Sequence, residues 1–438
     1  MKKEKIDIIL GPISSFVRNE STSGILLLAA AIVALAWANS PWAESYHHLW
    51  EEDIALDMGD HTLRRPLHFW INDGLMAMFF FVVGLELKRE MIGGELADPR
   101  KALLPMAGAV GGMAIPALIF FALNATPPQS AGWGIPMATD IAFALGIFAL
   151  LGSRVPIALK VFLTALAIAD DIGAVLVIAL FYTSDLSIIT VGTGLLFMLL
   201  LLGGNYLGVR SSVFYGLVGI GGVWLAFLMS GVHPTIAGVL AAMAIPARTK
   251  IDELGFSQKL THYKREFDLV PPNDLSLLEE EQMRVLSKIK NLTRSAETPL
   301  QRLENRLHPF VSFFVMPLFA FANAGVSVDQ SILQSLTDPL LTGTVLGLVV
   351  GKSLGITGVC RLMTWLGLAS LPQGVSWRHM LGMSFIAGIG FTMSLFIANL
   401  AYGSQDFLQQ AKLGVLVGSA IAGSIGFVLL RTGKKVDA

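Results

Sequence analysis

Phe162-Leu-Thr-Ala-Leu-Ala-Ile-Ala-Asp-Asp-Ile-Gly-Ala-Val-Leu-Val-Ile-Ala-Leu180 is long and apolar enough to cross a bilayer as one helix. Near its centre stand two adjacent aspartates, Asp170 and Asp171. About 20 mainly apolar residues in a helix span the hydrocarbon core of a membrane, so neither carboxylate could easily reach a surface. The stretch therefore predicts a transmembrane helix that carries two buried acids.

The composition of the whole chain agrees with a membrane setting. Of its 438 residues 54% are hydrophobic and 14% are charged, whereas soluble domains carry about 25% charged residues. The net charge of −1 gives none of the basic surface that nucleic-acid binders need, so we expect the lipid bilayer and small ions as partners. The single cysteine, Cys360, allows no internal disulfide and no thiolate metal cluster, and we expect no cofactor.

Twelve stretches are apolar over most of the length of a span. They lie at residues 22–39, 67–86, 102–123, 132–151, 156–182, 186–203, 212–228, 231–247, 309–324, 341–362, 379–400 and 411–431. They predict an all-α integral membrane protein with about twelve transmembrane helices, forming one transporter domain over residues 1–438. No Ala-x-Ala cleavage site follows the basic start of the chain, so we expect no removed signal peptide.

The basic residues predict how the chain is oriented. If both termini face the cytoplasm, nearly all of the 31 lysines and arginines lie in loops on that side or at the termini. The exceptions are Arg64, Arg65, Lys352 and Lys412. An excess of Lys and Arg marks the cytoplasmic side, so we expect a multi-pass protein of a bacterial inner membrane with both termini inside.

Two polar segments interrupt the predicted spans. Residues 40–66 alternate around Ile54-Ala-Leu-Asp-Met58 and contain a Gly59-Asp60 turn, which predicts a periplasmic β-hairpin. Residues 248–306 form a long cytoplasmic insertion with apolar residues at near-helical spacing after Asp274. We expect that part of the insertion to be helical and the rest to be mobile.

A faint internal repeat relates spans three to five with spans ten to twelve. Ala169-Asp-Asp-Ile-Gly173 resembles Ala422-Gly-Ser-Ile-Gly426. Thr139 precedes the first motif at the same offset at which Thr392 precedes the second. Span three starts inside and span ten outside, so the copies would form the inverted-topology repeat of many secondary transporters.

Two of the spans in this repeat contain residues that weaken a helix. Gly134 and Pro136 interrupt span four, and Gly388 and Gly390 interrupt span eleven. We therefore expect two broken helices that cross near the membrane centre with their dipole ends facing each other. Such ends need compensating charges.

Asp140 and Lys352 are the candidates for these compensating charges. Asp140 could neutralise two positive helix N-termini, and Lys352 could neutralise negative C-termini or pair with an aspartate. The simpler alternatives are an Asp140 that merely caps one helix and a Lys352 that snorkels to an interface.

Asp170 and Asp171 carry the functional prediction. Ionisable groups inside hydrocarbon are costly and usually face a cavity or a partner. Neighbouring carboxylates repel each other when ionised, and their hard oxygens suit a small alkali cation. Sodium ions and protons should therefore compete for this pair. The alternative is a pair neutralised by a nearby cation and needed only for packing.

Charges near the ends of other spans suggest a pH response. We assign it to Asp73, Glu86, Glu90, Glu304 and His233. The glutamates could form a cluster at the cytoplasmic end of span two, and a histidine can titrate near neutrality. The alternatives are solvated interfacial charges and a histidine that only caps or packs a helix.

Two rival functions also use buried acids. An intramembrane aspartyl protease needs its aspartates on separate helices, typically in a Gly-x-Gly-Asp motif, which this chain lacks. A passive cation channel needs a continuous pore with rings of charges or carbonyls. One acidic pair among inverted broken helices favours a secondary transporter, which is not an enzyme.

The chain resembles the NhaA-type sodium/proton antiporters over nearly its whole length. The matching motifs, in family order, are Asn72-Asp-Gly-Leu-Met-Ala-Met-Phe-Phe-Phe-Val-Val-Gly-Leu-Glu-Leu-Lys-Arg-Glu90, Ala138-Thr-Asp-Ile-Ala-Phe143, Ala169-Asp-Asp-Ile-Gly173, Ser230-Gly-Val-His-Pro-Thr-Ile-Ala-Gly-Val239, Pro317-Leu-Phe-Ala-Phe-Ala-Asn-Ala-Gly325 and Gly388-Ile-Gly-Phe-Thr-Met-Ser394. The resemblance implies an electrogenic exchanger of Na+ for H+ that also accepts Li+ and is activated at alkaline pH.

The resemblance also implies roles for single residues. Asp170 and Asp171 match the ion-binding pair of the family, Thr139 and Asp140 match its broken-helix site, and Lys352 matches its buried lysine. Each of these five positions therefore has an expected part in ion binding or transport.

Outside the ion site, the resemblance assigns two further segments. Glu86, Glu90 and Glu304 match the cytoplasmic pH-response cluster, and the hairpin in residues 40–66 matches a segment that joins two protomers into a homodimer. Asn305 departs from the family, which usually has histidine there. The pH profile therefore does not follow from the resemblance.

Overall fold

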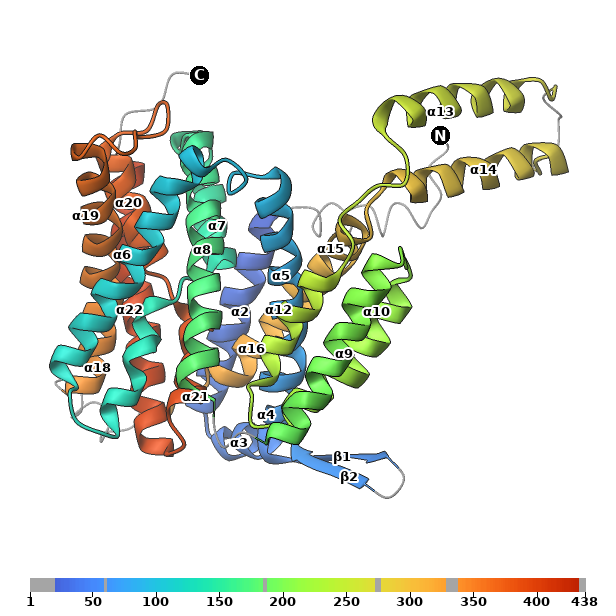
Figure 1. Cartoon of the computed structure of the whole chain (residues 1–438). Helices are drawn as coiled ribbons and strands as arrows, with labels where there is room; N and C mark the ends of the chain where they lie inside the picture. The colour runs from blue at the N-terminus through green and yellow to red at the C-terminus, as the bar shows by residue number, and fades with distance from the viewer. Residues whose placement is uncertain (1–19, 59–60, 184–186, 272–276, 328–337, 433–438) are drawn as a thin grey trace.

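The computed structural model describes residues 20–58, 61–183, 187–271, 277–327 and 338–432, which are helical over most of their length (Figure 1). The long helices run roughly side by side. A pair of strands and a pair of polar helices project from opposite ends of the bundle. The chain is therefore an all-α multi-pass membrane protein to which a small hairpin is added.

The first elements lie between Glu20 and the long polar connection. They are α2 (Glu20–Ala38), α3 (Ala43–Glu51), β1 (Asp53–Met58), β2 (His61–Pro66), α4 (Leu67–Phe69), the π turn η1 (Trp70–Leu75), α5 (Met76–Gly93), α6 (Pro99–Leu123), the 3₁₀ segment η2 (Gln129–Met137), α7 (Ile141–Leu151), η3 (Gly152–Arg154), α8 (Ile157–Phe181), α9 (Ile188–Tyr206), α10 (Ser212–Val218), η4 (Gly219–Trp224), α11 (Leu225–Leu228) and α12 (Pro234–Ala244).

The elements after this point complete the bundle. They are α13 (Glu253–Asp268), α14 (Glu280–Ala296), α15 (Pro299–Phe310), the π turn η5 (Val311–Val315), α16 (Met316–Asn323), α18 (Pro339–Leu346), the π turn η7 (Gly347–Gly351), α19 (Lys352–Trp365), α20 (Trp377–Ala387), α21 (Phe391–Ala401) and α22 (Gln405–Arg431). Each of the twelve stretches predicted to span the membrane contains helix.

Length and apolarity alone identify fewer spans than the sequence pattern predicts. Within the described residues, seven helical segments are long and apolar enough to cross a membrane, and two bent pairs raise the number to nine. One bent pair is α20 with α21, which meet at 44° across a short break. Helix α9 exposes Leu196 and Leu199 on its outer face, as expected where lipid is the solvent.

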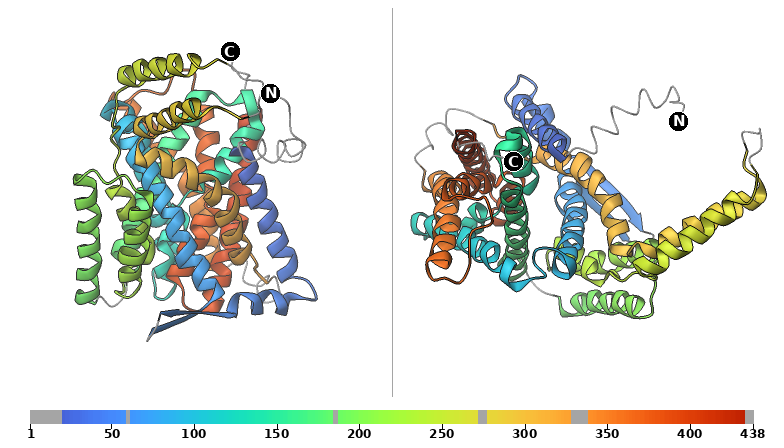
Figure 2. Two further views of the ribbon diagram at one scale, coloured as in Figure 1. Left: turned by 90° about the vertical axis from the view of Figure 1, so that its right-hand side faces the viewer. Right: turned by 90° about the horizontal axis from the view of Figure 1, so that it is seen from above.

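Two groups of helices pack side by side in the bundle (Figures 1 and 2). We call the first the repeat lobe, because it contains both copies of the predicted repeat: α6, η2, α7, α8 and the helices from α18 to α22. The second lobe contains η1 with α5, α9 to α12, α15 and α16. Helix α2 packs against α7 of one lobe and α16 of the other.

The hairpin lies within the segment where the sequence predicts one. Strands β1 and β2 pair antiparallel, with Asp53 opposite Pro66, and Nε of Arg64 lies 2.8 Å from a carboxylate oxygen of Asp53. The sequence pattern did not predict α3, which occupies the first part of the same segment. Its Tyr46 is buried and donates a hydrogen bond to the carbonyl of Phe321, which fixes α3 to the bundle.

The long polar connection contains more helix than the sequence suggested. Helix α14 falls where helical spacing was noted, but α13 is also helical, whereas we expected mobile chain there. Asp252 caps the first turn of α13, and Lys288 of α14 lies 2.5 Å from Glu266 of α13. A cap and a cross-helix ion pair are features that hydrophobic spacing does not reveal.

Small residues bring α6 and α19 into direct contact. A Cβ atom on Gly111 of α6 would overlap the carbonyl oxygen of Gly355 and the side chain of Val359 on α19. This close approach fits the general use of glycine between membrane helices, where lipid supplies no hydrophobic drive for association. It fixes α19, and with it Lys352, against α6.

We predict that Gly111→Ala lowers the melting temperature of the purified protein. The added methyl group must push α6 and α19 apart, and overpacking of this kind costs about 1–3 kcal/mol. Gly358→Ala on α19 is the matched control, because a Cβ there meets open space. Equal melting temperatures for the two variants in detergent would contradict this account of the packing.

Candidate functional site

Two interrupted helical segments meet at the centre of the repeat lobe. One break separates η2 from α7, and the other separates α20 from α21. The backbone N–H of Asp140 donates to the carbonyl of Ile389 at 2.7 Å, and the hydroxyl of Thr139 donates to the carbonyl of Ala387 at 2.9 Å. The two breaks therefore satisfy part of each other's backbone hydrogen bonding.

Asp140 lies between the N-termini of two helices and is fully buried. Its side chain caps α7 by accepting from the N–H of Phe143 at 3.0 Å. The same carboxylate accepts from the N–H of Thr392 at 3.1 Å, and from the Thr392 hydroxyl, in the first turn of α21. A negative charge at two helix N-termini offsets their dipoles, so the carboxylate does more than cap a single helix.

Lys352 is buried at the start of α19, with none of its surface exposed. Its Nζ lies 2.7 Å from Oδ2 of Asp170 and also donates to the carbonyl of Met137, the last residue of η2. The lysine thus contacts both a helix C-terminus and an aspartate, and it does not reach an interface. The two roles left open by the sequence are combined in one side chain.

Asp170 and Asp171 lie side by side on α8 but differ in their partners. Asp170 uses Oδ2 to bind Lys352, whereas its Oδ1 is buried without a hydrogen-bond partner within the described residues. Asp171 is 3% exposed and accepts no hydrogen bond from the part of the chain that the structure describes. Thr139 lies beside Asp170. The site therefore offers carboxylate oxygens that are not committed to the protein.

Those oxygens are suitable ligands for a small hard cation. In the described ranges no three His, Cys, Asp or Glu side chains converge as a metal cluster. A cation held between Asp170 and Asp171 would therefore complete its coordination with backbone carbonyls, the Thr139 hydroxyl or water. With so few protein ligands, the cation would be held weakly and could be released again.

Three of the predicted pH-response residues gather at the end of α5. Arg89 binds Glu304 of α15 at 2.5 Å and its neighbour Glu90 at 3.1 Å. Glu86 lies 3.8 Å from Nε2 of His308 and is close enough to Asp171 to affect it electrostatically. Of the three glutamates, Glu86 is the one that acts on the acidic pair.

Asp73 and His233 lie apart from that cluster. They contact each other at 3.4 Å, and His233 also caps α12 through Thr235. Asp73 precedes Glu86 by more than three helical turns, or about 20 Å at 1.5 Å per residue. The predicted pH-response residues of this span therefore lie at its two ends, Asp73 at one and Glu86 at the other.

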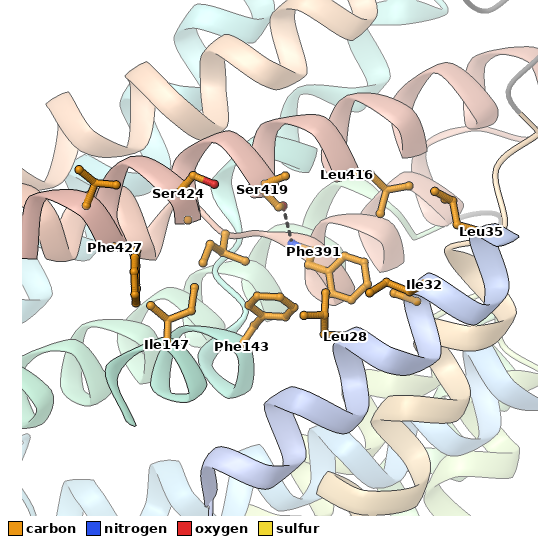
Figure 3. Close-up of a pocket in the computed structure, with 15 residues that line it drawn as sticks. Leu28, Ile32, Leu35, Phe143, Ile147, Phe391, Leu416, Ser419, Ser424 and Phe427 are labelled. Carbon is orange, nitrogen blue, oxygen red and sulfur yellow. Dashed lines mark hydrogen bonds between the residues drawn. The ribbon is translucent and has the colours of Figure 1, made fainter. Parts of the chain in front are cut away.

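The sequence did not identify some residues that complete the site. Thr392 was noted only as the repeat counterpart of Thr139, yet its N–H and hydroxyl bind Asp140. Ser419 of α22 accepts from the N–H of Phe391 at 3.2 Å and so caps α21 from outside (Figure 3). The repeat register was the available signal for Thr392, whereas nothing in the sequence pointed to Ser419.

An apolar hollow of about 560 Å³ lies beyond this cap. Figure 3 shows Leu28 and Ile32 of α2 facing Phe143, Phe391 and Ser419 across it. The hollow is not lined by Asp140, Asp170, Asp171 or Lys352. It therefore lies between part of α2 and the repeat lobe and is not part of the ion site.

Comparison with known proteins gives a consistent result. The family model described as Na+/H+ antiporter 1 matches residues 14–430. The chain is 49% identical to the Na(+)/H(+) antiporter NhaA of Oleidesulfovibrio alaskensis over 98% of this chain and 95% of that protein. It is 48% identical to Na(+)/H(+) antiporter NhaA 1 of Saccharophagus degradans, over 98% and 93%, and 48% identical to the NhaA of Acidithiobacillus ferrooxidans, over 96% and 97%.

We predict that Lys352→Ala destabilises the protein strongly. The change leaves Asp170 buried without its counter-charge and the η2 carbonyl without its donor, and breaking a buried pair in this way costs about 3–5 kcal/mol. Thermal unfolding in detergent measures the effect, with exposed Lys101→Ala as the control. The double variant Lys352→Ala with Asp170→Asn should recover part of the loss, and failure to do so would contradict the pairing.

The carboxyl of Glu304 gives a further prediction, on pH. Burial raises the pKa of Glu304, although Arg89 opposes the shift. The folded protein then holds this proton more tightly than the unfolded chain does. As the pH rises from about 4.5, the ordinary pKa of a glutamate, through the raised value, the folded state should therefore lose stability.

Glu304→Gln should remove this part of the pH dependence. The expected change is about 1.4 kcal/mol for each unit by which the pKa is raised. Melting curves recorded across that pH range measure the effect, with exposed Glu281→Gln as the control. A pH dependence that is the same in wild type and Glu304→Gln would show that this carboxyl does not contribute.

Proposed function

This chain belongs to the Na+/H+ antiporter 1 family, and from that premise we propose that it exchanges sodium ions for protons across the membrane at Asp170 and Asp171. One observation carries the proposal. The two carboxylates are buried side by side, and only Oδ2 of Asp170 is neutralised, by Lys352. The remaining carboxylate oxygens can bind either a proton or a cation.

The exchange follows from competition for these oxygens. Sodium binds when the pair is ionised and leaves when protons return, because protons and metal ions use the same lone pairs. A sodium ion that coordinates Asp170 through both oxygens must also displace the ammonium group of Lys352. Two carboxylates can bind two protons, so exchange of one Na+ for two H+ would move net charge and respond to membrane voltage.

We propose alternating access as the way in which the site meets each side. The contacts between the two breaks support this proposal. The hydroxyl of Thr139 donates to the carbonyl of Ala387 at the second break, and the hydroxyl of Thr392 donates to Asp140 at the first. We accordingly propose twelve crossings, with spans three to five and ten to twelve as an inverted repeat and spans four and eleven as the broken, crossing helices. Rocking of the repeat lobe against the second lobe would expose Asp171 to one side at a time.

The geometry gives less support to the rival functions. A protease would need two aspartates that face each other across a peptide bond, whereas Asp170 and Asp171 are consecutive on one helix. A passive channel would need a continuous path, yet Lys352 places a positive charge directly at the acidic pair. A cation that passed without exchange would be repelled there.

We propose that the cytoplasmic cluster adjusts activity to pH. Glu86 connects the cluster to Asp171 electrostatically, and Arg89 holds Glu90 and Glu304. Deprotonation of the cluster at alkaline pH would add negative charge near the pair, which would attract Na+ to the carboxylates once they are ionised. Asp73 and His233 would respond to pH separately from this cluster, at the outer end of the bundle.

Li+ should also be transported, because it is a small hard cation that carboxylates accept.

The remaining proposals concern location and assembly. We place the protein in the bacterial inner membrane with both termini in the cytoplasm, on the strength of its basic loops. We also propose a homodimer that forms through the hairpin of β1 and β2, which projects beyond the bundle in Figure 1. A short two-stranded hairpin is marginally stable by itself, and a second copy would support it.

We predict that Asp170→Asn and Asp171→Asn each abolish sodium-dependent proton movement while the protein still inserts. An amide can neither hold the charge that binds sodium nor exchange a proton at working pH. Sodium-induced pH changes in everted vesicles measure this, with and without an imposed voltage. The surface variant Asp406→Asn is the control, and normal exchange in either site variant would place the site elsewhere.

The affinity for sodium should fall as the pH falls. Each proton that must leave before sodium binds makes the apparent affinity change by up to about tenfold per pH unit, so two coupled carboxylates should give a slope steeper than one. Isothermal titration of sodium into detergent-solubilised protein between about pH 6 and 9 covers the range in which a buried pair titrates. A constant affinity across that range would exclude competition at the pair.

A further inference from the structure

Three asparagines connect the two lobes at one end of the bundle. Nδ2 of Asn399, on α21 of the repeat lobe, donates to Oδ1 of Asn323 on α16 at 2.8 Å. Nδ2 of Asn323 donates in turn to Oδ1 of Asn72 in the π turn η1, also at 2.8 Å. Asn323 is 1% exposed and Asn72 is 7% exposed. We call these three residues the amide ladder.

The amide ladder lies on the side of the ion site opposite the glutamate cluster. Asn399 follows Thr392, the partner of Asp140, by two turns of α21, or about 10 Å. Asn72 begins the span whose other end carries Glu86, and Asn323 is the last residue of α16. With the glutamate cluster in the cytoplasm, the ladder lies on the outer side of Asp171.

An aromatic contact lies between the ladder and the site. Phe396, less than one turn before Asn399, contacts Phe80 of α5 at 5.4 Å and Phe319 of α16 at 6.2 Å between ring centroids. These rings also bridge the two lobes and are buried. On this side of the ion site, a layer of aromatic rings therefore lies next to the site, and the amide ladder lies farther out.

The hydrogen bonding of the ladder is incomplete at one end. Asn399 and Asn323 give their second bonds to carbonyls in their own helices. Nδ2 of Asn72, in contrast, is buried without an acceptor in the described ranges. A buried donor of this kind is unusual and calls for an explanation. Its location in a π turn agrees, because such turns cluster at functional sites.

We propose that the amide ladder of Asn72, Asn323 and Asn399 is a latch that closes the outer side of the ion path and must open before Asp171 can meet the outside. The three are positioning residues, since none touches the ion site. The proposal rests on exchange at Asp170 and Asp171. A neutral amide bond suits this role, because it contributes little net stability and water replaces it readily when the lobes separate.

The ladder itself contains no group that titrates in the working range, because its three side chains are amides. Titratable groups lie beside it, however: Asp73 follows Asn72 directly and contacts His233, whose ring lies 5.6 Å from that of Phe396 between centroids. Any dependence of outer opening on pH would therefore come from Asp73 and His233 and not from the ladder.

Outward opening can be measured with a buried thiol. In a Cys360→Ser background, Ala320→Cys places a reporter one turn below Asn323 on α16, where Ala320 is fully buried. Asn399→Leu keeps the branching of the side chain at Cγ and removes its bond between the lobes. Labelling by a membrane-impermeant maleimide added from outside should become about fivefold faster, the shift given by the loss of one amide hydrogen bond.

Asn124→Leu is the matched control. Asn124 is buried too, but its bonds to Phe120 and Pro339 stay within the repeat lobe. This variant should lose thermal stability without faster labelling. If Asn399→Leu also melts earlier but labels at the parental rate, the ladder is only structural and the proposal fails.

A reversible cross-link tests the same idea without weakening the fold. Asn323→Cys with Asn399→Cys, again with Cys360→Ser, can be bridged by a short bis-methanethiosulfonate. Bridging should stop exchange, leave sodium binding measurable by titration, and be reversed by dithiothreitol. Full exchange in bridged protein would overturn the latch. Loss of sodium binding in Asp171→Asn, with the ladder intact, tests the ion site independently.

Discussion

Two buried charges hold together a fold that is interrupted at its centre. Inside a membrane, an unsatisfied backbone N–H or carbonyl costs several kcal/mol, and two broken spans free several such groups at once. Asp140 satisfies and neutralises the N-termini of α7 and α21, and Lys352 does the same for the C-terminus of η2. The two breaks and the helix ends beside them therefore depend on these two side chains for their positions.

The same compensation connects stability with chemistry. The ammonium group of Lys352 serves a helix end and Asp170 at once. A cation that replaced Lys352 as the partner of Asp170 would therefore also change the charge next to the C-terminus of η2. If sodium binds at Asp170 as proposed, it would change the charge at this helix end without a separate transmission device, because one side chain contacts both. The close packing of α6 and α19 fixes the position from which the lysine acts.

Much of the architecture could be predicted from the sequence, because membrane spans leave strong patterns. Apolar length predicts where the helices lie, and Gly134, Pro136, Gly388 and Gly390 mark the breaks. The cost of burying charge identified Asp140, Asp170, Asp171 and Lys352 as residues that must face a cavity or a partner. The sequence could not choose between the two roles of Lys352, since contacts between distant helices decide that.

Other features had no local signal. Helix α13 depends on a cap and on the Lys288–Glu266 pair rather than on an apolar stripe. Asp73 and Glu86 flank one span, but their partners, His233 and His308, come from other helices and could not be predicted. Ser419 and the three asparagines of the ladder look like ordinary polar residues until helices from distant parts of the chain meet.

The sharing of Asp140 has a consequence for how such a chain can evolve. In the register that pairs Thr139 with Thr392, the position equivalent to Asp140 is Met393, so one half supplies a charge that the other half lacks. A single carboxylate now serves helices from both halves. Two identical copies of either half would bring two acids or none to the same crossing, so neither half could form this site by pairing with a copy of itself.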